Sequence, residues 1–158
     1  MFVIGDKIVY PMHGAGIIED IEEKEILGDT GSYYILKLPI GNMKLMIPVK
    51  NFQELGLRDI VDEKTIDEVV TVLGRGQDEE ENNWNKRYRK NMDKIKTGDI
   101  YMVAEVVRNL HLLDAEKGLS TGEKKMLNNA KQILVSEFVL VKNMSKEDVE
   151  QYINDNIK

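Results

Sequence analysis

The spacing of apolar residues changes once along this chain, near Asp62, and this change constrains the fold more than any other feature. Before it, short runs alternate apolar and polar residues and are broken by Pro and Gly, whereas after it apolar residues recur every three or four positions. A period of two is typical of half-buried strands and a period of 3.6 of helices. The 158 residues therefore predict an α+β fold in two domains, with strands over 1–60 and helices over 61–158.

The first half predicts a small barrel. We expect four short strands, at residues 7–10, 16–21, 32–38 and 43–47, with a glycine-containing turn at 28–31 and a junction to the second half at 51–62. A flat sheet of this size would leave unpaired edges. The strands are therefore expected to curl into an SH3-like or Tudor-like barrel.

The second half predicts a bundle of about five helices with well-marked starts. Three capping boxes are expected: Thr65 with Glu68, Ser120 with Glu123, and Ser145 with Asp148. At 97–99, Gly98 can close one helix and Asp99 can cap the next. Residues 74–83, which include the acidic run 78–81, are the expected long loop.

Charge is distributed unevenly along the chain. Residues 1–83 hold 8 Lys and Arg against 17 Asp and Glu, whereas residues 84–142 hold 12 against 7. The formal net charge of -6 therefore hides a basic second half. Such asymmetry suggests that the two halves have different partners, one of them a polyanion.

Residues suited to catalysis or metal binding are scarce. The chain has no Cys and only two histidines, His13 in a turn and His111 in an apolar helix, with no serine-nucleophile motif nearby. The acidic run 78–81 lacks the spacing of a calcium loop. We therefore expect no enzyme, cofactor or metal, although a small hydrolase built on either histidine stays as a minor hypothesis.

One segment combines cations with aromatic residues. Between residues 84 and 96 there are six Lys and Arg and one acid, the densest positive stretch of the chain, and it includes Lys86, Arg87, Arg89 and Lys90. Cations in the first turn of a helix oppose its dipole, so Lys86 and Arg87 are poor choices for helix stability alone. Helix N-termini attract phosphates, and flanking cations strengthen that attraction. The pattern favours contact with a nucleic-acid backbone over an ordinary solvated face.

Trp84, the single tryptophan, opens this segment and has two interpretations. It is either an anchor packed on the core, as the start of a stripe with Tyr88 and Met92, or a ring that projects from the helix end beside the cations. A projecting ring is suited to stack on bases or to wedge into a duplex step. The sequence alone leaves both open.

Several motifs together resemble the CarD/CdnL family of bacterial transcription regulators. The similarity covers nearly the whole chain, and its motifs are Gly5, Asp6, Val9, Tyr10, Pro11, His13 and Gly14; Asn83, Trp84, Lys86, Arg87 and Tyr88; Gly98 and Asp99; Val103 to Arg108; and Gly118 to Ser120 with Gly122 to Lys124, Met126 and Leu127. The first of these motifs is similar to a module also found in transcription-repair coupling factors.

The resemblance implies a Tudor-like domain that docks on the β subunit of RNA polymerase and a helical domain that touches promoter DNA. A tryptophan matching Trp84 would enter the minor groove at the upstream edge of the bubble, while Lys86, Arg87, Arg89 and Lys90 would meet phosphates. Relatives often carry Arg where this chain has Lys24 and Met46. Met46 is either a polymerase contact or an ordinary strand residue, and Lys44 beside it can supply the missing charge.

The resemblance also sets the remaining expectations. The protein would be a transcription regulator that acts in the cytoplasm through polymerase, because no apolar run approaches the roughly 18 residues of a membrane span and the first seven residues lack a signal-peptide layout. The alternative is a protein-protein adaptor whose basic segment binds an acidic partner without touching DNA.

Overall fold

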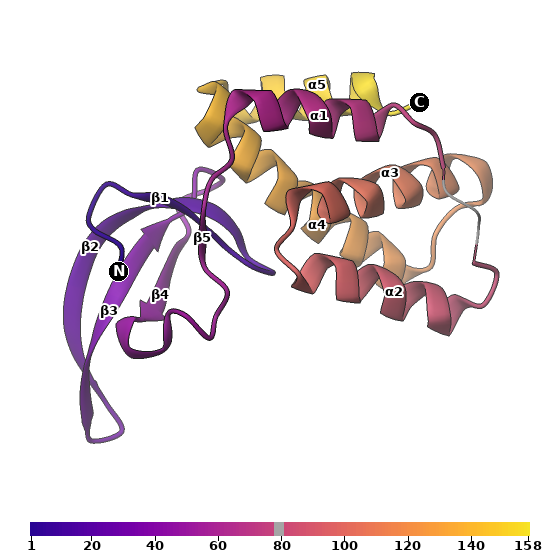
Figure 1. Ribbon diagram of the computed structural model, residues 1–158. Coiled ribbons are helices and arrows are strands. Elements are labelled where there is room, and N and C mark those ends of the chain that lie inside the picture. Colours follow the sequence, from indigo (N-terminus) through magenta and orange to yellow (C-terminus); the bar gives the residue numbers. More distant parts are fainter. Residues whose placement is uncertain (78–80) are drawn as a thin grey trace.

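A computed structural model describes residues 1–77 and 81–158 of the chain. Strands occupy its first part and helices its second part (Figure 1), so the predicted α+β class is confirmed. Of the acidic run 78–81, all but Glu81 falls outside the described residues.

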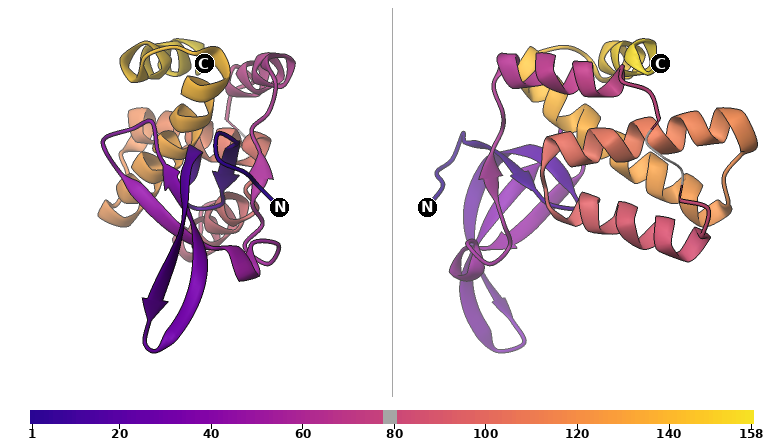
Figure 2. Two further views of the ribbon diagram at one scale, coloured as in Figure 1. Left: turned by 90° about the vertical axis from the view of Figure 1, so that its left-hand side faces the viewer. Right: turned by 45° about the vertical axis from the view of Figure 1, so that its right-hand side comes forward.

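Five strands form one antiparallel sheet in the order β4-β3-β2-β1-β5. Their bounds are β1 Lys7–Tyr10, β2 Gly14–Ile26, β3 Asp29–Lys37, β4 Lys44–Pro48 and β5 Arg58–Asp59, with a short 3-10 turn at Val49–Asn51. The sheet curls around its own small core (Figure 2), which consists of Ile8, Ile18, Tyr34, Leu36, Leu38 and Ile47. The predicted Tudor-like arrangement is confirmed.

Two strands are longer than predicted. β2 continues to Ile26 and β3 starts at Asp29, so the expected turn at 28–31 is a tight turn at Leu27 and Gly28, both with positive φ. Residues 23–30 of this hairpin are exposed, and residues 22–25 are all charged. A ribbon exposed on both faces shows no apolar alternation, and for that reason the pattern missed it.

Five helices follow: α1 Glu63–Leu73, α2 Trp84–Lys96, α3 Ile100–Lys117, α4 Thr121–Lys142 and α5 Lys146–Asn156. The predicted caps at Ser120 and Ser145 are confirmed, because each hydroxyl accepts the amide of the acid three residues on, at 3.2 and 3.1 Å. Asp99 caps α3 as predicted, through the amide of Tyr101. The capping box predicted at Thr65 and Glu68 was wrong.

Asp62, not Thr65, caps α1. Its Oδ1 accepts the Thr65 amide at 2.8 Å, so the cap lies three residues before Thr65, the helix begins at Glu63, and Thr65 falls inside its first turn. Aspartate is at least as good an N-cap as threonine. The bonds from Thr65 also lower the pKa of Asp62 below its ordinary value.

Glycines allow the strand half to approach the helical half closely. A Cβ on Gly98, which has a φ of +71°, would lie 2.8 Å from the Pro11 ring, and a Cβ on Gly14 would lie 2.8 Å from Ser136 Oγ. That same Oγ accepts the Ala15 amide at 2.8 Å in a buried bond. Pro11 and Gly14 of the first motif thus lie at the same interface as Gly98, which belongs to a motif far away in the sequence.

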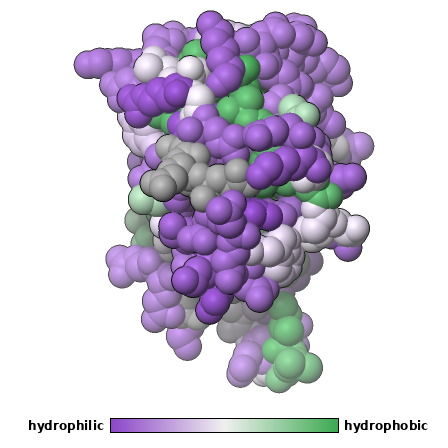
Figure 3. Space-filling view, turned by 90° about the vertical axis from the view of Figure 1, so that its right-hand side faces the viewer, coloured by the Kyte–Doolittle hydropathy of each residue, from purple (hydrophilic) through white to green (hydrophobic). Residues whose placement is uncertain are grey.

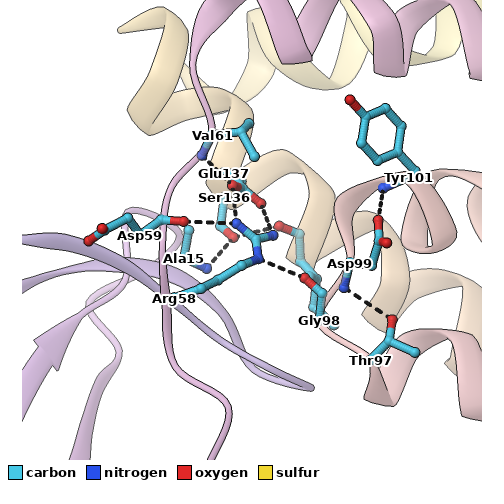
Figure 4. Close-up of polar contacts among 11 residues, drawn as sticks. Ala15, Arg58, Asp59, Val61, Thr97, Gly98, Asp99, Tyr101, Ser136 and Glu137 are labelled. Atoms are coloured by element: carbon cyan, nitrogen blue, oxygen red, sulfur yellow. Dashed lines mark hydrogen bonds and ion pairs between the residues drawn. The ribbon is translucent and has the colours of Figure 1, made fainter. Parts of the chain in front are cut away.

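Arg58 fixes this interface. Its guanidinium donates to both carboxylate oxygens of Glu137 at 2.8 Å and its Nε donates to the Gly98 carbonyl at 2.9 Å. Figure 4 shows Arg58 reaching from the strand half to α4 and to the α2–α3 turn. Glu137 is buried and also accepts the Val61 amide. We call Arg58, Glu137 and Gly98 the interdomain clamp.

Within the described residues, no helix has the length and apolar character needed to cross a membrane.

Candidate nucleic-acid interface

The basic segment begins at the end of the molecule farthest from the sheet. There α2 begins, α3 ends and α4 begins (Figures 1 and 2). Figure 3 looks onto this end, and the described part of its surface is mostly hydrophilic. We call residues 84–90 the tip of α2.

Trp84 is the first residue of α2, and its environment is intermediate between the two predicted ones, a core anchor and a projecting ring. The residue is 42% exposed, so it is not a core anchor. Its ring nevertheless stacks on Tyr88, with centroids 5.2 Å apart and planes 24° from parallel, and Nε1 donates to Ser120 Oγ at 3.0 Å. Both rings lie over Gly122 in the first turn of α4. Trp84 is therefore a half-exposed ring held in place by a neighbouring helix.

Arg87 is partly buried and is bonded to neighbouring parts of the protein. Its Nε and one terminal nitrogen donate to the two oxygens of Glu123 at 2.7 and 2.8 Å, and its other terminal nitrogen donates to the Glu81 carbonyl. The Glu123 side chain is only 2% exposed and that of Arg87 18%. These bonds from Arg87 lower the pKa of Glu123 below its ordinary value. Arg87 thus joins α2 to α4.

The other predicted cations of the tip, Lys86, Arg89 and Lys90, are exposed. Asn83 caps the helix by accepting the Lys86 amide, and the first turn contains no acid. The positive end of the helix dipole is therefore not neutralised by a side chain of that turn. Such an end is suited to phosphate groups.

Sequence reasoning missed two further cations at this end. Lys124 and Lys125 are exposed in the first two turns of α4, the helix that begins beside Trp84. The only available signal was their place directly after the capping box, which does not say which helix end lies nearby. The packing of α2 beside α4 is a feature of the tertiary structure and cannot be predicted from local sequence.

On the sheet, the three residues predicted to contact polymerase share one face. Met46 lies directly opposite Ile35, which lies opposite Asp20, and directly opposite residues point to the same side. Lys44 is two residues from Met46, and Lys24 is four residues from Asp20, so the period of two keeps both on that side. Lys24 and Lys44 form exposed ion pairs with Glu22 and Glu19, and Met46 is 44% exposed.

The two histidines of the minor hydrolase hypothesis lie in separate elements. His13 lies against the Tyr10 ring in the turn before β2, with ring centroids 4.3 Å apart and planes tilted by 40°. His111 is partly buried on α3, where Nδ1 lies 3.2 Å from Lys131 Nζ. Burial is the main cause that lowers the pKa of His111, with the charge of Lys131 second. Neither arrangement contains a nucleophile and base in hydrogen-bond contact.

Comparison with known proteins covers both halves. Residues 2–61 match the family described as CarD-like/TRCF RID domain, and residues 68–154 match the family described as CarD, C-terminal domain. The Bacillus subtilis (strain 168) protein YdeB, named as a candidate transcription factor, is 43% identical over 152 residues, which span 96% of this chain and 99% of that protein. The chain therefore belongs to the CarD/CdnL family.

Proposed function

We propose that this chain is a transcription regulator that docks on the β subunit of RNA polymerase and stabilises the open promoter complex. Residues 1–60 would be the docking domain and residues 61–158 the DNA-contacting domain. Trp84 would enter the minor groove at the upstream edge of the bubble, with Lys86, Arg89 and Lys90 on the phosphates. One observation carries this proposal: the only tryptophan is a half-exposed ring at the tip of a helix, and its exposed neighbours include the cations Lys86, Arg89 and Lys90.

Docking is assigned to the face of the sheet that carries Lys24, Lys44 and Met46. An exposed methionine between cations offers an adaptable apolar contact with a charged rim. The sheet lies at one end of the molecule and the tip of α2 at the other (Figure 1). A polymerase surface and a DNA fork can therefore be contacted at the same time.

The mechanism needs no energy source. A factor that binds the open complex more tightly than the closed one shifts their equilibrium by the difference in affinity. A preference of about 1.4 kcal/mol shifts it roughly tenfold. Tethering to polymerase raises the local concentration of the factor at the promoter, so the chain can be acidic overall and still act on DNA.

The test compares Trp84→Ala with Met102→Ala. Met102 is exposed to a similar degree, 38% against 42%, but lies at the other end of the bundle, at the start of α3. The measurement is the lifetime of open complexes formed by polymerase with each variant, with polymerase affinity measured alongside. We expect Trp84→Ala to shorten the lifetime about fivefold or more, as loss of a stacking contact of about 1 to 3 kcal/mol would do, and Met102→Ala to leave it unchanged.

Equal lifetimes for the two variants would refute the wedge. Failure of the full chain to bind polymerase at all would refute the docking assignment. Binding to an acidic protein with no effect of forked DNA would favour the adaptor alternative instead.

A further inference from the structure

The hydroxyl of Ser120 is completely used by its neighbours. Its Oγ accepts the Glu123 amide at 3.2 Å and the Trp84 Nε1–H at 3.0 Å, and it donates to Glu123 Oε1 at 3.4 Å. A serine hydroxyl offers two acceptor lone pairs and one donor, so no capacity is left over. One side chain thus caps α4 and at the same time binds the ring of Trp84.

Trp84 has only one polar group, the indole N–H. Because Ser120 already accepts it, the exposed part of the side chain can offer only ring surface. A ring without a free donor can stack or wedge, but it cannot donate to a base edge. The minor groove would then be contacted at this point without a hydrogen-bond reading of its bases.

Trp84 also needs an anchor because of its position. It is the first residue of α2, and helix ends fray. The Arg87–Glu123 pair holds the helix backbone one turn later but does not fix the rotation of the indole. Fixing that rotation before DNA binds removes an ordering cost at the moment of contact.

We propose that Ser120 is the positioning residue of Trp84, holding the indole through Nε1 so that the ring meets DNA by its surface alone, whatever the base sequence. This inference rests on the proposed function, because it assigns a geometry to the same wedge.

The first arm of the test measures the free protein. Trp84 is the only tryptophan, so the intrinsic tryptophan fluorescence of the full chain reports this ring alone. Ser120→Gly removes the anchor but keeps an acceptable N-cap, which costs only a few tenths of a kcal/mol. Ser145→Gly is the matched control, since Ser145 caps α5 in the same way and no hydrogen bond joins it to Trp84. We expect Ser120→Gly alone to lower the fluorescence anisotropy and to increase quenching by acrylamide.

The second arm measures open-complex lifetime. Ser120→Gly should shorten the lifetime about three- to tenfold, the range of one net hydrogen bond, and Ser120→Thr, which keeps the hydroxyl, should restore it. In a Trp84→Phe background the N–H is absent, so Ser120→Gly should have no further effect. Trp84→Phe should shorten the lifetime by the same factor on promoters that differ only at the fork.

The results that would contradict this inference differ from those that would contradict the proposed function. Unchanged anisotropy in Ser120→Gly, or an equal change in Ser145→Gly, would overturn the anchor. A normal lifetime for Ser120→Gly beside a short one for Trp84→Ala would overturn this inference and leave the proposed function standing. A normal lifetime for Trp84→Ala would refute the wedge itself, and this inference with it.

Discussion

Two adjacent cations of the tip of α2, Lys86 and Arg87, have different surroundings. Lys86 is exposed, whereas Arg87 makes a bidentate pair with buried Glu123. Neutralising an exposed lysine leaves nothing buried without a partner, while removing Arg87 leaves a carboxylate that is shut off from water. The same charge change therefore has different consequences one residue apart.

We expect Arg87→Ala to lower the free energy of unfolding by about 3 kcal/mol, the usual cost of breaking a buried pair, and Lys86→Ala by less than about 0.5 kcal/mol. Urea denaturation measures both. On forked DNA, Lys86→Ala should reduce the log-log salt slope of binding by about one unit. Similar stabilities for the two variants would contradict this division.

The ring of Trp84 should contribute to stability only modestly. Truncation of a buried tryptophan to alanine costs about 3 to 5 kcal/mol. Trp84 is 42% exposed, but its ring is stacked and hydrogen-bonded. We expect Trp84→Ala to cost about 1 to 2 kcal/mol in urea denaturation. A loss above about 4 kcal/mol would restore the core-anchor interpretation.

At the scale of elements, the joint between α2 and α4 should depend on pH. The pKa of Glu123 is lowered in the folded protein by the Arg87 guanidinium, so the unfolded chain binds its proton more readily. The stability from this pair is present above the ordinary glutamate pKa of about 4.3 and is lost as pH falls through the folded value. Thermal melts of wild type and Glu123→Gln across acidic pH should therefore converge. The variant Glu147→Gln, in the first turn of α5, serves as control.

The β2–β3 hairpin carries an unfavourable turn. Leu27 has a φ of 54° and is fully exposed, and Gly28 also has a positive φ. Two-residue turns of this kind favour Asn followed by Gly. Leu27→Asn should therefore raise the free energy of unfolding by about 1 kcal/mol. A loss of stability would show that the leucine makes a stabilising contact.

The elements that the sequence predicted are those with a complete local signal. The Ser120 and Ser145 caps and the Gly98–Asp99 break need only neighbours within a few residues, and the structure contains them. The exposed ribbon after Ile21 and the two-residue strand β5 lack an apolar period, and the cap of α1 was misplaced because Asp62 and Thr65 compete for it. Partners such as Glu123 for Arg87, or Ser120 for Trp84, lie 36 residues apart and required the tertiary structure.

At the scale of the whole molecule, the interdomain clamp should control both stability and geometry. Arg58→Ala leaves Glu137 buried without its guanidinium, so we expect a loss of about 3 kcal/mol in thermal or urea unfolding. Arg58→Lys should rescue little, because an ammonium cannot bind both carboxylate oxygens in the same plane. Polymerase affinity should stay near wild type while open-complex lifetime falls. An unchanged lifetime would show that the angle between the halves does not matter.

The clamp also gives α2 a mechanical role. Trp84 is the first residue of this helix, and the turn after its last residue contacts Pro11 and Arg58 of the strand half. Under the proposed function, a closing DNA duplex pushes on the free end of a rod of 13 residues, about 20 Å long. Compression then passes along the helix axis into the sheet, and from there into polymerase. RNA polymerase, which opens the promoter, would thus also resist the force with which the duplex closes.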